Sequence, residues 1–430
     1  MPSVFWEGPI VYAALKVFRE NPEMRRLALL FAWVYFAQGM WALPDLSLTF
    51  LLKEKFRFSP ADVATFFTIA TIPWYIKPLY GLISDFLPLW GYRRKSYFIL
   101  ATLFAVLAGL SLGNWATGSY QLTLALFTLM ALGFAFADVL ADALMVENGQ
   151  ALGITGSLQA VQWGSIMLAL VVVGVAGGYL AQHTPLNIAF RLTAIFPAVT
   201  FLMVFWAVRE SRRGSDPEVF RRTWRSVRSG IASKRLWGIA GFIFFYNFSP
   251  SFGPSIVYYM TDHLKFSKVF IGTLDSISAA SGIAGAALYF VYSKSFPLRT
   301  IINWSIGFGV IGTLAYFGLA GHASAVLIYL AFGSVSLIAQ LAFLDLAARA
   351  CPKEAEGTFF ALLMSIFNLG MKGSAIVGGW LYTTVGYQWL VVISAAFTAA
   401  AWLLVPLVKI DELEPRAEPA GAVSPASAAS

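Results

Sequence analysis

The stretch SYQLTLALFTLMALGFAFADVLADALMVENGQ, residues 119–150, joins a long apolar segment to three acidic residues near its end. A helix needs about 20 consecutive apolar residues to cross the hydrocarbon layer of a membrane, and residues 119–146 exceed that length. Asp138 and Asp142 nevertheless lie inside the segment, where an ionised group costs at least ~2.5 kcal/mol. The stretch therefore predicts a membrane-spanning helix whose acidic side chains face a cavity or a partner instead of lipid.

The composition of the whole chain extends this prediction. Of the 430 residues, 58% are hydrophobic and only 12% are charged, against roughly 25% charged in an ordinary soluble domain. Apolar stretches of spanning length recur along the chain, separated by short polar or Gly/Pro turns. We predict twelve membrane-spanning helices, at 26–52, 59–82, 96–113, 119–146, 155–181, 186–208, 236–261, 268–293, 300–319, 323–348, 355–382 and 386–408.

The second six spans weakly repeat the first six. LLKEKFRFSPADVATF, residues 51–66, is similar to MTDHLKFSKVFIGTL, residues 260–274, and each lies between the first and second span of its half. Parallel repeats of this kind build the two bundles of many transporters. We therefore predict an all-α membrane protein with two six-helix bundles around a central cavity. The expected parts are an N-terminal segment (1–25), the bundles (26–208 and 236–408), a basic linker (209–235) and a disordered tail (409–430).

The positive residues indicate the orientation of the chain. The net charge is +8, and most lysines and arginines fall in loops on one side of the predicted spans. The opposite loops hold only Lys53, Lys55, Arg57, Lys265 and Lys268. Because cytoplasmic loops carry the excess of Lys and Arg, we expect both termini in the cytoplasm and a multi-pass protein of a bacterial inner membrane. Basic loops next to lipid headgroups also explain the charge without nucleic acid as a partner.

Polar side chains are distributed unevenly among the predicted spans. The third, sixth, ninth and twelfth spans are nearly bare, whereas the other eight carry polar residues, Asp45, Asp275 and Gln340 among them. Helices that line an aqueous cavity can hydrate such groups, and helices that face lipid cannot. The expected substrate-binding residues are Lys77, Asp138, Asp142, Gln159, Gln162, Trp163, Asn247, Asp345, Asn368 and Lys372.

The acids in the spans are also the candidates for proton coupling. Coupling needs a carboxyl group whose protonation changes with burial and with nearby charge, and we expect this role for Asp138, Asp142 and Asp345. Asp138 and Asp142 are four residues apart, so they share one face of their helix. The alternative is that these acids form structural ion pairs, and the sequence leaves this open; the possible basic partners are Lys77, Arg191 and Arg349.

A loop motif follows the second span. GLISDFLPLWGYRRKSY, residues 81–97, resembles the inner-loop signature of the major facilitator superfamily, with about five extra residues between Asp85 and the glycine and basic cluster. Glu147 should lie at the inner rim, because it is nine residues from Asp138, or roughly 13 Å along the helix axis. We expect an inner gate formed by Asp85, Arg93, Arg94, Lys95 and Glu147.

Three stretches in order, KPLYGLISDFLPLWGYRRKSY (77–97), ADVLADALMVE (137–147) and EGTFFALLMSIFNLG (356–370), resemble the folate-biopterin transporter family. The resemblance implies a major facilitator fold that takes up folates or related pterins, with protons as the coupling ion. The chemistry of the residues agrees with this. The carboxylate of Asp138, Asp142 or Asp345 can accept two hydrogen bonds from a pterin edge. Lys77 and Lys372 can meet the glutamate tail, and aromatic rings can stack on the pterin. The stacking candidates are Trp163, Phe245, Tyr246 and Phe367.

Other functions remain to be compared with this one. A carrier for a sugar, a nucleotide or a peptidoglycan fragment would use the same fold, and so would a membrane sensor that transports nothing. An enzyme is not expected, because the chain has no nucleophile elbow and no His-Glu-x-x-His motif. Cys351 is the only cysteine, so one chain cannot form a disulfide. We expect a monomer without a cofactor or metal site.

Overall fold

The computed structural model describes residues 21–115, 118–152, 154–212, 233–292, 295–351 and 356–410. Across these ranges the chain is helical, and the one β-type pairing found there is an isolated bridge between Leu89 and Tyr92. Residues 1–20 of the predicted N-terminal segment, 213–232 of the linker and 411–430 of the tail lie outside the described residues.

The helices follow the order of the predicted spans. The N-terminal half contains α2 (Pro22–Met40), α3 (Asp45–Phe50), the π-helical turn η1 (Leu51–Lys55), α4 (Pro60–Ala70), η2 (Ile72–Trp74), α5 (Lys77–Phe86), α6 (Lys95–Trp115), α7 (Tyr120–Leu152), α8 (Thr155–His183) and α9 (Leu186–Ala207). The C-terminal half contains α11 (Lys234–Asn247), α12 (Gly253–Asp262), α13 (Lys268–Tyr292), α14 (Leu298–Ala315), η4 (Tyr316–Gly318), α15 (His322–Ala350), α16 (Glu356–Val385), α17 (Tyr387–Ala400), η5 (Ala401–Leu403) and α18 (Val405–Val408).

Nine helical segments of the described chain are long and apolar enough to cross a membrane. They match nine of the twelve predicted spans, although a turn at residues 41–44 interrupts the first of these. The second, seventh and twelfth spans are divided into shorter helices. The structure therefore differs from the continuous helices expected at 26–52, 59–82, 236–261 and 386–408. Proline explains two of the breaks, because it lacks the N–H that a helix interior needs. Pro73 and Pro78 lie at the break between α4 and α5, and Pro250 and Pro254 lie near the break between α11 and α12.

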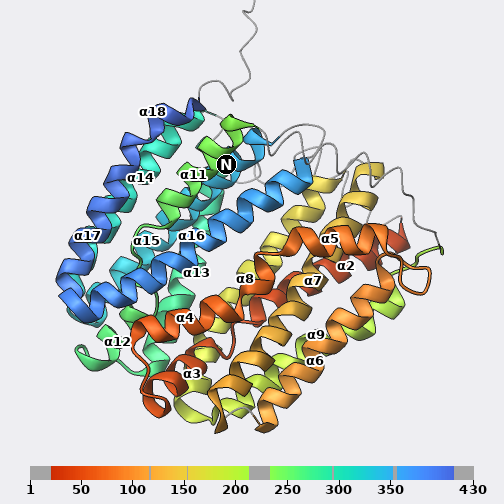
Figure 1. Cartoon of the computed structure of the whole chain (residues 1–430), viewed down its shortest axis with the longest axis horizontal. Helices are drawn as coiled ribbons and strands as arrows, with labels where there is room; N and C mark the ends of the chain where they lie inside the picture. Colours follow the sequence, from red (N-terminus) through yellow and green to blue (C-terminus); the bar gives the residue numbers. More distant parts are fainter. Residues whose placement is uncertain are drawn as a thin grey trace, which may run out of the picture.

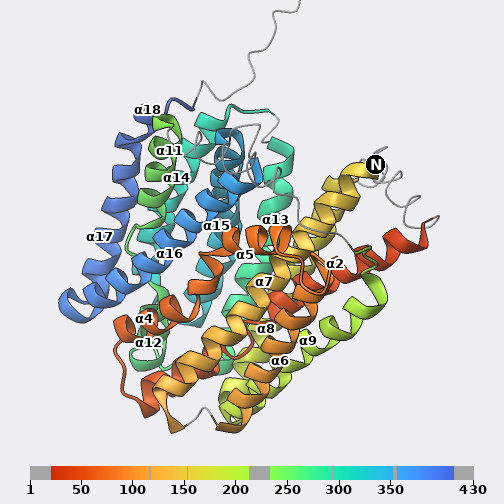
Figure 2. The same ribbon diagram turned by 45° about the vertical axis from the view of Figure 1, so that its right-hand side comes forward.

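Each half of the chain packs around its own apolar residues. Phe66, Phe127 and Phe190 are buried in the N-terminal half, and Phe242 and Phe343 are buried in the C-terminal half. Figures 1 and 2 show the two groups of helices side by side, with α14 and α17 on one flank and α6 and α9 on the other. Helices α8 and α13 lie between them, and the two helices are packed against each other.

The contact between α8 and α13 depends on small residues. Gly174 and Gly178 of α8 face Gly272 of α13, so the two backbones approach closely. Ser276 of α13 is buried, donates a hydrogen bond to the carbonyl oxygen of Val171 at 2.6 Å, and accepts one from the N–H of Val175 at 2.8 Å. Small residues commonly allow such close packing between membrane helices.

Two ion pairs also join the halves, next to the turns that follow α3 and α12. Lys53 Nζ lies 2.5 Å from Asp262 Oδ1, and Lys268 Nζ lies 2.9 Å from Glu54 Oε1. Helix α16 approaches α4 on the same side, where Gly379 packs against Ala61. Contacts between the halves thus gather at the end of the molecule that carries these two turns.

Candidate functional site

An ion pair between a buried carboxylate and a partly buried lysine lies inside the N-terminal half. Lys77 Nζ is 2.5 Å from Asp138 Oδ2, and the Asp138 side chain is only 3% exposed. The break before α5 places Lys77 at the first position of that helix, where its side chain reaches α7. The Lys77 ammonium group also lies 4.6 Å from the centre of the Trp74 ring. Two of the predicted site residues therefore contact each other directly.

Asp142, one turn further along α7, has different partners. The Tyr35 hydroxyl of α2 donates to Asp142 Oδ1 at 2.6 Å, and Gln162 Nε2 of α8 donates to the same oxygen at 3.3 Å. Gln162 is fully buried. Tyr35, Lys77, Asp138, Asp142 and Gln162 are called the carboxylate network below. It joins four helices within one half of the chain.

Asp345 is held on its own helix. Arg349 Nε donates to Asp345 Oδ1 at 2.9 Å and Arg349 Nη2 donates to Oδ2 at 2.8 Å, which is the two-bond geometry typical of guanidinium and carboxylate. This is the ion pair that the structural alternative predicted for Asp345. Arg191 instead donates to Asn114 Oδ1 at 2.7 Å.

The remaining predicted site residues are spread over both halves. Gln159 and Trp163 of α8 are exposed. Asn247 donates to the carbonyl oxygen of Ile243 in its own helix, at 2.8 Å. Asn368 and Lys372 lie on α16, and Lys372 interacts electrostatically with Asp45 of α3 in the other half.

A cavity of about 400 Å³, called the interfacial cavity, lies between the halves. Its wall includes residues of α3, α8, α13 and α15, and its polar side chains are Asp45, Asp275, Ser278, Ser336 and Gln340. None of these five was among the expected substrate-binding residues. Three of them had a signal in the sequence, since Asp45, Asp275 and Gln340 are polar residues in apolar spans.

A second cavity of about 360 Å³, called the aromatic cavity, lies in the C-terminal half. It adjoins the interfacial cavity, because Ser278, Gly333, Ser336 and Gln340 line both. The predicted residue Asn247 lines it. Its aromatic side chains are Tyr246, Phe252, Phe308, Tyr316, Tyr329, Phe332, Phe343 and Phe367. Its wall therefore offers many flat apolar faces beside a polar chamber.

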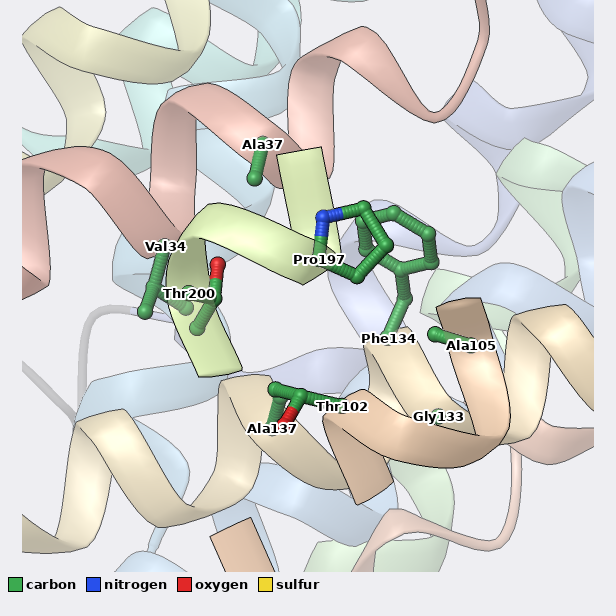
Figure 3. Close-up of a pocket in the computed structure, with 9 residues that line it drawn as sticks. All are labelled: Val34, Ala37, Thr102, Ala105, Gly133, Phe134, Ala137, Pro197 and Thr200. Carbon is green, nitrogen blue, oxygen red and sulfur yellow. The ribbon is translucent and has the colours of Figure 1, made fainter. Parts of the chain in front are cut away.

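A third opening lies inside the N-terminal half and has a volume of only about 10 Å³. Figure 3 shows apolar side chains around it, with Val34 and Ala37 on one side, Phe134 and Ala105 on another, and Pro197 facing them. This is about the space that one water molecule needs, so the opening cannot hold an organic solute.

The predicted inner-gate residues lie around the start of α6. Arg94 is buried and donates to Glu147 Oε1 at 2.9 Å and to Ser84 Oγ at 2.6 Å. The backbone N–H groups of residues 93–95 donate to the carboxylate of Glu210, at 2.9 to 3.3 Å. A carboxylate is favoured at the N-terminus of a helix. Asp85 lies in α5, and its side chain is outside the described residues.

Glu210 was not expected at this position, because the linker was interpreted from its basic residues alone. These contacts of Arg94 and Glu210 join parts of the N-terminal half and the start of the linker. They fix the loop between α5 and α6 to α7 and to the start of the linker. In the part of the chain that the structure describes, no group of three or more His, Cys, Asp or Glu side chains could hold a metal ion.

Comparison with known protein families shows to which family this chain belongs. The sequence profile of the BT1 family matches residues 38–410, which is most of the chain. The chain belongs to the BT1 family. A BT1 relative from Synechocystis sp. named "Folate-biopterin transporter" is 33% identical over 92% of this chain and 81% of its own length. "Folate transporter 1" of Plasmodium falciparum is 24% identical over 90% of this chain and 77% of its own length. The family resemblance predicted from three stretches of the BT1 chain is therefore confirmed.

A solved structure supports the fold. The crystal structure of a D-xylose-proton symporter matches 90% of the BT1 chain and 98% of its own chain, with a TM-score of 0.68 and 13% identity. The predicted all-α major facilitator fold is confirmed. The protein is a multi-pass membrane transporter, and its family and relatives are transporters instead of enzymes.

Proposed function

We propose that this protein moves folates or related pterins across the membrane by alternating access, in symport with protons. The observation that carries the proposal is the pair of adjoining cavities, one of about 400 Å³ between the halves and one of about 360 Å³ in the C-terminal half. Volumes of this size suit a small organic solute. The names of the relatives support folates and pterins as its class.

The lining of the cavities suits both parts of a folate. The flat pterin ring needs stacking partners and acceptors for its N–H and amino groups, and the aromatic cavity adjoins a chamber with two carboxylates. The glutamate tail is anionic and needs a cation. Lys372, which interacts electrostatically with Asp45 of that chamber, supplies one. A sugar carrier would have no use for this cation.

The distribution of contacts supports alternating access. The halves meet through α8 and α13, through α16 with α4 and α5, and through two ion pairs at the end with the turns after α3 and α12. If the two halves separated at this end and approached each other at the other end, the cavities would open to the opposite side of the membrane. With both termini in the cytoplasm of a bacterial cell, the contacts close the outer side, and the protein works as a monomer.

The carboxylate network supplies the proton sites. Protonation of Asp138 would remove the charge that holds Lys77, and protonation of Asp142 would weaken the hydrogen bond that it accepts from the Tyr35 hydroxyl. Either event alters contacts between α5 or α2 and α7, so proton loading can favour one conformation. Asp345 is bound by a guanidinium on its own helix. We therefore assign coupling to Asp138 and Asp142 before Asp345.

Uptake by purified protein tests this function. Proteoliposomes should take up labelled folic acid faster with an inward proton gradient, and Asp138→Asn should abolish the effect of the gradient. Glu23→Gln makes the same chemical change at an exposed position at the start of α2 and should behave as wild type. Equal rates of folic acid uptake with and without the proton gradient would exclude proton coupling.

Competing solutes test the other functions. Unlabelled biopterin should inhibit folic acid uptake, and an excess of sugars, nucleotides or peptidoglycan fragments should not. A protein that binds folic acid without moving it would be a sensor. A folded protein that neither binds nor moves folic acid or biopterin would overturn the proposal.

A further inference from the structure

We propose that Asp275 is the carboxylate that binds the donor edge of the pterin ring, with the ring itself in the aromatic cavity. The inference rests on the proposed function and names the subsite for one part of its substrate. Asp275 was not among the substrate-binding residues expected from the sequence, and it replaces Asp138, Asp142 and Asp345 in that role.

The three acids expected to bind the pterin already have strong partners. Asp138 contacts Lys77 at 2.5 Å, and Asp142 accepts the Tyr35 hydroxyl at 2.6 Å. Asp345 accepts two hydrogen bonds from Arg349. A ligand would have to displace these partners before it could use the carboxylates. In addition, none of the three lines either of the two large cavities.

Asp275 has the opposite environment. It lies on α13, about 10 Å along the helix from Lys268, and its side chain lines the interfacial cavity. Among the described residues, no hydrogen bond or ion pair of Asp275 is found. Its neighbour Ser276 is hydrogen bonded to α8, which fixes the rotation of α13 at this point. The carboxylate is therefore held towards the cavity with its acceptor oxygens available.

Asp275 lines the interfacial cavity and lies close to the aromatic one. Its carboxylate is within electrostatic range of Tyr316 and Tyr329, and both tyrosines line the aromatic cavity. Their rings are 6.4 Å apart and inclined at 63°. A flat ring in that cavity would turn its N–H and amino donors towards Asp275, and paired hydrogen bonds to one carboxylate are strong and directional.

The opposite wall of the interfacial cavity fits the remainder of a folate. Asp45 of α3 faces the same space, and its Oδ1 atom is buried without a hydrogen-bond partner. Lys372 interacts electrostatically with Asp45 across the halves. A tail carboxylate near Lys372 would offer this lysine a second anion. Ring and tail would therefore be bound by different residues of the C-terminal half, with Asp275 on α13 responsible for the ring alone and Lys372 on α16 for the tail.

Three ligands separate these contributions. Binding of biopterin (ring only), folic acid (ring and tail) and p-aminobenzoylglutamate (tail only) is measured on full-length protein in nanodiscs. In Asp275→Asn an amide N–H₂ replaces one acceptor and opposes a ring donor. We expect the Kd of biopterin and folic acid to rise at least about tenfold. The Kd of p-aminobenzoylglutamate should not change, and Glu23→Gln should leave all three Kd values unchanged.

The outcomes are distinct. Wild-type protein that binds neither biopterin nor folic acid would overturn the proposed function together with this inference. Wild-type protein that binds both, with Asp275→Asn binding them equally well, would overturn the inference and leave the function intact. An equal rise in the Kd of all three ligands in Asp275→Asn would overturn the ring-specific role of Asp275. The melting temperature of the variant, followed by tryptophan fluorescence, checks that it is folded.

Discussion

At the scale of single residues, the ion pair between Lys77 and Asp138 gives a clear prediction. Lys77→Met leaves the buried Asp138 carboxylate without its cation, and breaking a buried pair in this way costs about 3 kcal/mol. We expect a melting temperature several degrees below wild type for purified protein in detergent. The double variant Lys77→Met/Asp138→Asn has no unpaired charge and should recover at least half of the loss.

The control for this cycle is the single variant Asp138→Asn, which removes the other charge of the pair. Equal melting temperatures for Lys77→Met and wild type would mean that the pair contributes nothing to stability. If the melting temperature of the double variant fell by the sum of the two single decreases, the two residues would not interact energetically.

Sequence reasoning found part of this network. The spacing of Asp138 and Asp142 placed both on one helix face, and polarity within a span identified Gln162. Tyr35 was not found, because tyrosine is a usual residue at the membrane–water interfaces, and its presence in a span does not show which side chain its hydroxyl contacts. Its contact with Asp142 depends on the relative rotation of α2 and α7. Asp275 was recognised as polar, but its open environment depends on the packing of α13 against its neighbours.

At the scale of helices, the close contact between α8 and α13 should control closure of one end. A methyl group at Gly178 would lie 2.9 Å from the carbonyl oxygen of Lys268, so Gly178→Leu must push the helices apart. We expect this variant to favour the conformation that is open at that end. Ser278→Cys, in a Cys351→Ser background, reports this opening, because residue 278 lines both cavities.

The measurement is the rate at which a membrane-impermeant maleimide labels that cysteine from outside intact cells. The rate should rise at least about fivefold in Gly178→Leu. Gly164→Leu on the same helix is the matched control, because nothing lies within 4 Å of an added Cβ there. An unchanged rate in Gly178→Leu, or an equal rise in Gly164→Leu, would contradict a closing role for the contact.

The extent of sequence prediction differs between helices. Hydropathy located the spans, since apolar length is what a membrane demands of a helix. It did not locate the breaks, because a window average does not register individual prolines. The stretches TIPWYIKP (71–78) and SPSFGP (249–254) each contain two prolines, which was a usable signal. The break before α5 matters for the site, since it places Lys77 opposite Asp138.

At the scale of the whole molecule, the internal repeat forms a quasi-symmetric closure between the halves. Phe50 and Glu54 in the first half correspond to Tyr258 and Asp262 in the second, each an aromatic residue and an acid four positions apart. Each pair receives a lysine of the other half. Lys53 lies 4.4 Å from the centre of the Tyr258 ring and pairs with Asp262, and Lys268 lies 4.0 Å from the Phe50 ring and pairs with Glu54.

The two turns that carry this closure also share a backbone feature. Arg57 and Lys265, at corresponding positions, both have a φ of 56°, an uncommon conformation for residues other than glycine. Each is followed by Phe-Ser. The Tyr258 hydroxyl donates to the carbonyl oxygen of Phe58 at 2.5 Å, so one turn is bound directly to the other half. The weak sequence repeat therefore corresponds to a repeated structure at the contact between halves.

Charge reversal tests whether this closure holds the end shut. Asp262 is half exposed, so the pair should contribute about 1 kcal/mol or less and be screened by salt. Lys53→Glu turns attraction into repulsion, and we expect labelling of Ser278→Cys from outside to rise about two- to fivefold at low ionic strength. Adding Asp262→Lys restores attraction with the charges exchanged and should return the rate to near that of wild type. Both effects should shrink at high salt.

Two outcomes would contradict this role. In the first, the double variant labels as fast as the summed effects of the two single substitutions require; in the second, the labelling rates do not depend on ionic strength. Either would show that the turns meet without controlling the opening of this end.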